Sequence, residues 1–211
     1  MSPSKSASTA RPNSASADRR SYHHGDLRRA VLSAALDVIA AEGPGALSLR
    51  DLARRAGVSH AAPAHHFKDR TGLLTAIAAE GFGLLADALR EASGLREASG
   101  LREAGVSYVR FAREHPAHFQ VMFSPQLLRT EDLELITARA LASDALTRAV
   151  AGVDPGDRGP DSRLAGMAAW SLAHGYATLL LGHNLDGRLG EEDPEDTFRA
   201  LTEMLFHSAA D

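Results

Sequence analysis

The chain has 211 residues, a formal net charge of −4 and no cysteine. The absence of cysteine excludes disulfides, thiolate zinc sites and cysteine nucleophiles, and no stretch reaches the roughly 18 uncharged apolar residues that a membrane span needs. Residues 1–20 also lack the apolar core of a signal peptide. We therefore expect a soluble, cytoplasmic protein that makes no contact with a membrane.

The charge is divided unevenly along the chain. Residues 1–75 carry eleven Lys or Arg against six Asp or Glu, a net charge of +5, which leaves −9 for the remainder. A basic head on an acidic body suits a protein that touches nucleic acid at one end, because neutralised phosphates supply the sequence-independent part of affinity. From charge alone, a merely solvated surface remains the alternative.

The N-terminal segment is expected to be a tail followed by a helix. Residues 1–20 are rich in Ser, Ala and Pro and have almost no large apolar side chain, which predicts a disordered tail. Arg19 and Arg20 at its end could reach a DNA groove. From Gly25 the apolar residues follow the helical period until Gly43-Pro44-Gly45 interrupts it, which predicts the first helix.

The segment 48–67, SLRDLARRAGVSHAAPAHHF, predicts two short helices over 49–56 and 60–66. Ser48 and Asp51 fit a capping box at the start of the first helix. Gly57 suits the left-handed residue that ends that helix, and Ser59 can cap the second. A tight turn containing Gly between two such helices is what a helix-turn-helix requires.

The body is expected to consist of further helices. A fourth helix begins near Asp69, which can cap it, and later ones are predicted over 131–150, 162–183 and 195–208. No segment shows the alternation typical of a strand, so the expected fold class is all-α.

An internal repeat occupies residues 89–105, with LREASG at 89–94, LREASG at 95–100 and LREAG at 101–105. A period of six does not match 3.6 residues per turn, so its leucines cannot form one buried stripe. We interpret the repeat as a duplicated polar helix or helix-loop between body helices; a functional repeat is the alternative.

Enzyme and metal chemistry find no support in the sequence. The chain lacks GxSxG, GxGxxG and HExxH patterns, so we expect neither an enzyme nor a cofactor. Among the ten histidines only His115 and His118 have a helical i,i+3 spacing, and none forms a metal pattern with a carboxylate, so no metal site is expected. His174 could present its imidazole to a pocket, or be a core histidine bonded to a backbone carbonyl.

The sequence from Ser21 to Phe82 resembles the N-terminal head of TetR/AcrR-type transcriptional regulators. WSLAHG, which contains Trp170, His174 and Gly175, is similar to the signature of the WHG-type C-terminal domain found in one branch of that family, and HPAHFQVMF at 115–123 fits the same branch. The resemblance implies an all-α homodimer whose heads read a palindromic operator in double-stranded DNA and whose bodies hold a small-molecule effector.

The resemblance divides the chain into a tail (1–20), a helix-turn-helix domain (21–70) and a helical ligand-binding and dimerisation domain (71–211). It implies a recognition helix from His60 to Phe67 that enters the major groove. The expected DNA-binding residues are Arg50, Arg54, Ser59, His60, Ala61, Ala64, His65 and Lys68. At Ala64 the chain departs from many relatives, which carry an aromatic residue, usually Tyr.

Two further sets follow from the same resemblance. The effector-pocket candidates are Phe82, Phe111, Phe119, Met122, Phe123, Trp170, His174 and Tyr176. The dimer-interface candidates are Leu172, Leu179, Leu201, Leu205 and Phe206, with packing inside one subunit as the alternative.

The expected function is that of a ligand-responsive repressor. The opposing hypothesis is a helical protein–protein interaction module without specific DNA binding, which predicts no salt-dependent affinity for DNA.

Overall fold

The computed structural model describes residues 14–93, 98–151 and 162–206, and over these ranges the chain contains helices and no strand. The predicted all-α class is therefore confirmed. The helices are α1 (Ser14–Glu42), α2 (Leu49–Arg55), α3 (Ala62–Phe67), α4 (Arg70–Ser93), α5 (Ala98–Glu114), α6 (Pro116–Met122), α7 (Leu133–Ala151), α8 (Ser162–Leu181), α9 (Asp186–Leu189) and α10 (Pro194–Phe206), with short 3-10 turns η1 (Pro44–Ala46) and η2 (Pro125–Leu127).

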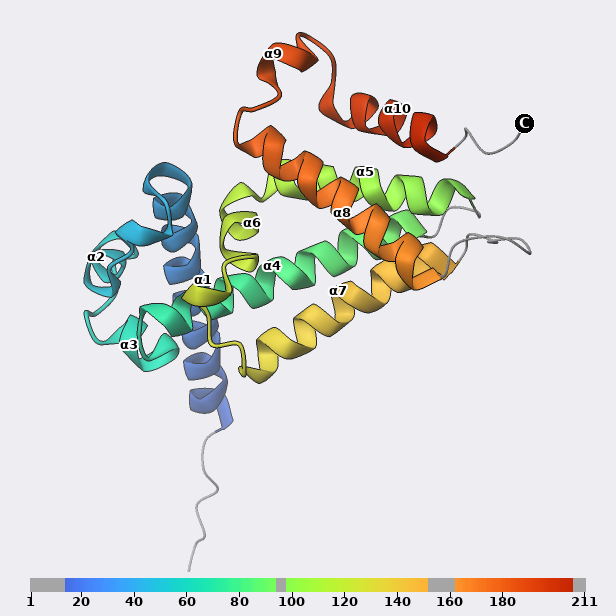
Figure 1. Ribbon diagram of the computed structural model, residues 1–211. Coiled ribbons are helices and arrows are strands. Elements are labelled where there is room, and N and C mark those ends of the chain that lie inside the picture. The colour runs from blue at the N-terminus through green and yellow to red at the C-terminus, as the bar shows by residue number, and fades with distance from the viewer. Residues whose placement is uncertain (1–13, 94–97, 152–161, 207–211) are drawn as a thin grey trace, which may run out of the picture.

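The helices form a small head and a larger body that share one long helix (Figure 1). The head consists of α1, α2 and α3, and α4 leaves it directly to run through the body. Helices α5 and α7 pack along α4, α8 crosses the body over α5 and α7, and α6 lies at the junction with α1. The arrangement places one rigid element between the two ends of the molecule.

Helix α4 is the central helix of the body. Its apolar residues recur every three or four positions, and Leu73, Leu74, Ile77 and Leu89 are almost completely buried. Two helices are long and apolar enough to cross a membrane by composition alone: 61% of the apolar window in α4 is buried, against 17% in α8. Helix α4 is thus a core helix, whereas α8 leaves much of its apolar surface uncovered in the single chain.

The first helix begins earlier than the sequence analysis predicted. It starts at Ser14, so residues 14–20, which were expected in the disordered tail, are helical. Residues 14–42 contain no proline, and extending an existing helix costs far less than nucleating one, so no apolar stripe is needed there. The remainder of the predicted tail, residues 1–13, lies outside the described residues.

The LREASG repeat contributes to two helices. Its first unit lies at the end of α4, where Leu89 is buried, and its third lies in α5, where Leu101 packs partly buried against the core. Residues 94–97 lie outside the described residues. Leu89 and Leu101 therefore belong to two body helices and to their apolar packing, whereas the sequence analysis placed the repeat as a polar segment between body helices.

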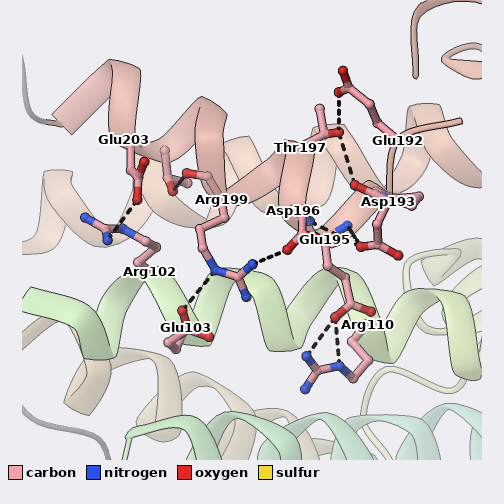
Figure 2. A network of polar contacts seen from close by, with 12 residues as sticks. Arg102, Glu103, Arg110, Glu192, Asp193, Glu195, Asp196, Thr197, Arg199 and Glu203 are labelled. Atoms are coloured by element: carbon pink, nitrogen blue, oxygen red, sulfur yellow. Dashed lines mark hydrogen bonds and ion pairs between the residues drawn. The ribbon is translucent and has the colours of Figure 1, made fainter. Parts of the chain in front are cut away.

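Helix α10 packs on α5 through a buried aromatic ring and through the ion pairs that Figure 2 shows. Phe198 is only 1% exposed and lies so close to Gly105 that a Cβ there would come within 2.8 Å of the ring. Arg110 donates to Glu195 at 2.7 Å, and Arg199 to Glu103 at 3.3 Å. The C-terminal helix thus belongs to the fold of its own chain.

Candidate functional site

The turn between α2 and α3 is closed by backbone hydrogen bonds around Gly57. Gly57 has a φ of +66°, a conformation that residues with a Cβ adopt at a cost. The Val58 amide donates to the Ala53 carbonyl at 3.0 Å and the Gly57 amide donates to the Arg54 carbonyl at 3.3 Å. This is the Schellman pattern that ends a helix. The predicted role of Gly57 is confirmed.

The capping box predicted at the start of α2 is wrong. Ser48 precedes α2 but its side chain makes no capping hydrogen bond. Asp51 instead accepts hydrogen bonds from Arg54 at 2.7 Å and from Arg55 at 2.6 Å, because charge-assisted bonds to guanidinium groups outcompete neutral ones. The two arginines hold the pKa of the Asp51 carboxyl below its ordinary value.

Helix α3, the expected recognition helix, begins two residues later than predicted. Its N-cap is Ala61, with no side-chain cap, so Ser59 does not cap it and His60 lies in the turn before it. Pro63 is in the first turn, where its missing N–H wastes no helical hydrogen bond, and it is buried together with Phe67.

The opposite side of this helix-turn-helix faces solvent. All eight residues expected to contact DNA are exposed: Arg50, Arg54, Ser59, His60, Ala61, Ala64, His65 and Lys68. The exposed residues of α3 are alanine and histidine, and Lys68 adds a positive charge at the C-terminal end of the helix. A duplex could approach this surface without displacing core side chains.

The connection from α3 to α4 is a strained γ-turn. Lys68 has φ 67° and ψ −59°, and the Asp69 amide donates to the Phe67 carbonyl at 2.8 Å. Gly72 packs against that carbonyl so closely that a Cβ would lie 2.0 Å from the Phe67 oxygen. Only a glycine at this position allows α4 to begin directly beneath the end of α3.

The Asp69 carboxylate also stabilises the junction between α3 and α4, through two hydrogen bonds. Its Oδ1 accepts a hydrogen bond from the Gly72 amide at 2.9 Å, which confirms its predicted role as the cap of the fourth helix. Its Oδ2 accepts from Arg129 at 2.6 Å, and the Arg129 amide donates to the Thr75 hydroxyl at 3.0 Å. The head is thereby tied to the body segment before α7.

A cavity of about 580 Å³ lies between α4, α5, α7 and α8. Its apolar wall includes Phe82, Leu85 and Leu89 from α4 and Trp170 from α8. This volume falls within the range of about 300–1,000 Å³ typical of small-molecule sites. Of the predicted pocket residues, Phe82 and Trp170 line this cavity.

A second cavity of about 510 Å³ reaches the head. Phe119, Phe123 and His174 line it, together with Ala40 of α1. The ring centroids of Phe123 and Phe82 are 5.7 Å apart, and those of His174 and Trp170 are 5.6 Å apart. Aromatic rings that line one cavity therefore pack directly against those that line the other.

His174 lies at the centre of this aromatic cluster. Its Nδ1 is 2.9 Å from the Tyr108 hydroxyl, so its ring partner is a side chain and not the backbone carbonyl considered from the sequence. Burial lowers the pKa of His174 and raises the pKa of Tyr108. The imidazole is therefore neutral at pH 7, and the tyrosine hydroxyl donates to Nδ1 when the imidazole proton is on Nε2.

Three predicted pocket residues line neither of these cavities. Phe111 borders a smaller groove of about 340 Å³ with several charged neighbours. Met122 is buried against Gly81, where a Cβ would come within 2.6 Å of its sulfur. Tyr176 packs against Phe198 and donates to the Pro194 carbonyl at 2.8 Å, so it belongs to the docking of α10.

Sequence reasoning missed the polar residues of the larger cavity, among them Tyr108 and Arg139. Arg139 lies on α7 between Leu135 and Ala142, which are both buried, and shares their face at helical spacing. The sequence signal that could have identified Arg139 is a charged residue at a position of the otherwise apolar face of α7.

Helix α8 presents an uncovered apolar strip. Leu164, Met167 and Leu179 are 49%, 53% and 47% exposed. Of the dimer candidates, Leu179 belongs to this strip and Leu172 and Leu201 are partly buried against the core. The side chains of Leu205 and Phe206 lie outside the described residues.

No group of three or more metal-ligating side chains occurs within the described ranges. The polar clusters found there are ion pairs such as those in Figure 2.

Family models match both parts of the chain. Residues 31–77 match the model of bacterial regulatory proteins of the tetR family, and residues 101–205 match the tetracyclin repressor-like C-terminal domain. The chain belongs to the TetR family of transcriptional regulators. TetR-family regulators are soluble DNA-binding proteins and are typically not enzymes. No curated protein sequence matches the chain.

Solved structures show the same TetR fold over most of the chain. A protein of unknown function from Rhodococcus sp. RHA1 is 34% identical, with a TM-score of 0.72 over 90% of this chain and 98% of the other. The TetR-family regulator PfmR from Thermus thermophilus is 23% identical, with a TM-score of 0.67 over 86% and 99%. AibR, solved with isovaleryl coenzyme A and operator DNA, is 16% identical, with a TM-score of 0.64 over 85% and 98%.

Proposed function

We propose that this TetR-family regulator is a ligand-responsive repressor that binds a palindromic operator as a homodimer in the cytoplasm. The observation that carries the proposal is the course of α4. The helix begins at Arg70, directly after the turn that holds the recognition helix, and continues without interruption to Leu85 and Leu89 in the wall of the larger cavity. A molecule in that cavity would therefore contact the element that positions the recognition helix.

The exposed surface of α2, the turn and α3 would read the operator. His60, Ala61 and Ala64 would face base edges in the major groove, while Arg50 and Lys68 would contact phosphates. Arg54 is held by Asp51 in the free protein, so a phosphate would have to share it with that carboxylate. With few long side chains on α3, selectivity would depend on thymine methyl groups and on the shape of the duplex.

The uncovered strip on α8 would form the dimer interface. Large exposed apolar patches on a soluble protein mark interaction surfaces, and Leu164, Met167 and Leu179 repeat along one helix. A two-fold axis beside α8 would place the two heads on successive major grooves of a palindrome, about 34 Å apart. Leu179→Glu would then convert the dimer to monomers in sedimentation, whereas Leu133→Glu, on the exposed start of α7, would not.

Regulation would follow from differential binding. The dimer would have two states, one with the heads at the spacing of the operator half-sites and one with the heads at a different spacing. An effector that binds the second state more tightly would lower operator affinity by the difference in its binding free energy between the two states. The AibR complex supports the pairing of an effector site with an operator site in one chain, because a protein of the same fold was solved with isovaleryl coenzyme A and operator DNA.

Selection of duplexes from a random DNA library by the purified protein, at two salt concentrations, tests the proposal. We expect a palindrome to be enriched and its affinity to fall steeply with salt. His60→Ala and Lys68→Ala should weaken binding to the enriched site. Arg148→Gln, an exposed arginine on α7 remote from α3, is the matched control and should bind like the wild type.

The opposing hypothesis of a protein-interaction module predicts a different result. It expects no enriched sequence and no salt-dependent retention of DNA, and that outcome would overturn the proposal of an operator-binding repressor.

A further inference from the structure

The larger cavity contains the partly buried guanidinium of Arg139. Arg139 extends from α7 so that its guanidinium carbon lies 5.3 Å from the centroid of the Phe82 ring. Among the described residues, no carboxylate or other hydrogen-bond acceptor contacts this guanidinium, which is unlike the ion-paired arginines of α10 and α5. A partly buried guanidinium with only an aromatic face as its partner has unused donors.

The rest of the lining is either apolar or positive. Arg163 from α8 is the second charged residue of the wall, and none of the lining residues is acidic. Leu85, Leu89 and Leu146 provide aliphatic surface, and the uncharged polar groups include Tyr108. A cationic ligand would meet repulsion here, and a wholly apolar one would leave the donors of Arg139 unused.

Arg139 lies at one end of the row of α4 residues that line the cavity. Phe82, beside Arg139, and Leu89 are two turns apart on α4, about 10 Å along its axis. A ligand with one anionic end at Arg139 could thus extend an apolar chain along the leucines of α4. The anionic end would lie nearer the head, because α4 runs from the head towards Leu89.

We propose that this cavity binds an amphipathic anion, with a carboxylate or phosphate group held by Arg139 and an aliphatic body packed against Leu85, Leu89 and Leu146. Carboxylate and phosphate oxygens accept two parallel hydrogen bonds from a guanidinium, which no alcohol or amine can do. The inference rests on the proposed function in one respect, since the anion would be the effector, but the binding itself is measured without DNA.

The chain carries its own reporter for the test. Trp170 is the only tryptophan of the protein and lies in the wall of this cavity. The full-length protein is titrated, below micelle-forming concentrations, with decanoate, decyl phosphate and decanol, which share one chain length and differ in the head group. We expect a saturable change in Trp170 emission with the two anions at concentrations at least tenfold lower than with decanol. Which of the two anions binds more tightly distinguishes a carboxylate from a phosphate ligand.

Variants locate the anion. Arg139→Gln should raise the Kd for decanoate and decyl phosphate at least tenfold and leave the Kd for decanol unchanged. Arg148→Gln lies on the same helix with its side chain exposed and paired with Asp144, and should bind all three compounds like the wild type. Arg139→Lys keeps the charge without the two parallel donors and should fall between wild type and Arg139→Gln.

Equal affinity of the wild-type protein for decanol and the anions would overturn the proposal, and this comparison needs no variant. Absence of any saturable response in fluorescence and calorimetry would overturn it as well, as would anion binding that Arg139→Gln leaves unchanged. An anion that binds through Arg139 but does not alter retention of the selected operator would confirm the site and refute its role as the effector site.

Discussion

Replacing Gly72 by Ala tests whether the close approach of α3 and α4 determines the geometry of the head. An alanine inside a helix is normally more stable than glycine by about 0.8–1.0 kcal/mol. Here the new Cβ would lie 2.0 Å from the Phe67 carbonyl oxygen and 2.7 Å from an Arg129 nitrogen. The arginine can move, but the carbonyl belongs to the turn at Lys68 and cannot move without displacing the recognition helix.

Overpacking of this kind costs about 1–3 kcal/mol, and a backbone atom as the obstacle places Gly72→Ala towards the upper end of that range. After the helical gain is subtracted, we expect a net loss of about 2 kcal/mol, which corresponds to a fall in Tm of about 4–8 °C for a chain of this size. Operator affinity should fall at least tenfold, because α3 is displaced.

Gly83→Ala is the matched control for this prediction. Gly83 lies on the same helix, and nothing lies within 4 Å of a Cβ built there. It should raise the stability by up to about 1 kcal/mol and leave operator affinity unchanged. Calorimetric melting and operator titration of the two variants measure both effects. If Gly72→Ala stabilises the protein as Gly83→Ala does, the steric argument is refuted.

The remaining predictions concern the docking of α10, the charge of the head and the response to pH. Phe198→Ala should lower the free energy of unfolding in urea by about 3–5 kcal/mol and Glu103→Gln by less than about 1 kcal/mol, and equal losses would refute the dominant role of the ring in docking α10. Asp51→Asn should release Arg54 to a phosphate and steepen the slope of log affinity for non-specific DNA against log salt by about 1, which an unchanged slope would contradict. The folded state lowers the pKa of His174 below its ordinary 6.5, so the unfolded chain takes up that proton first and stability falls as the pH drops from 6.5 through the folded pKa. Urea unfolding between pH 7 and 5 should show a shallower loss for His174→Phe, and identical profiles would rule out this contribution.

Features set by local chemistry could be predicted from the sequence. Gly57 ends α2 and Asp69 caps α4 because each role depends on a residue's own conformational or hydrogen-bonding preference. The apolar period likewise predicted most of the helices of the body. Such signals are contained in a few consecutive residues.

Features set by competition or by distant neighbours could not be predicted. The capping box of Ser48 failed because two arginines on the same helix compete for Asp51. The cavity residues Tyr108 and Arg139 lie on helices far apart in sequence and become neighbours only through packing against α4. The burial of Tyr176 against Phe198 likewise depends on where α10 docks.

Only Lys68 and Asp69 separate the recognition helix from α4, and both are fixed by hydrogen bonds. The head therefore moves together with the start of α4, so a rotation of α4 within the body is transmitted directly to α3. From the head end at Arg70 to Phe82 the distance along the helix is about 18 Å, so a tilt of about 10° at the cavity would displace the head end by about 3 Å. This displacement is close to the rise of one base pair, which is about 3.4 Å because one helical turn of about 34 Å contains about 10 base pairs. A tilt small enough to leave the packing of the body intact would thus put the recognition helix out of register with its bases.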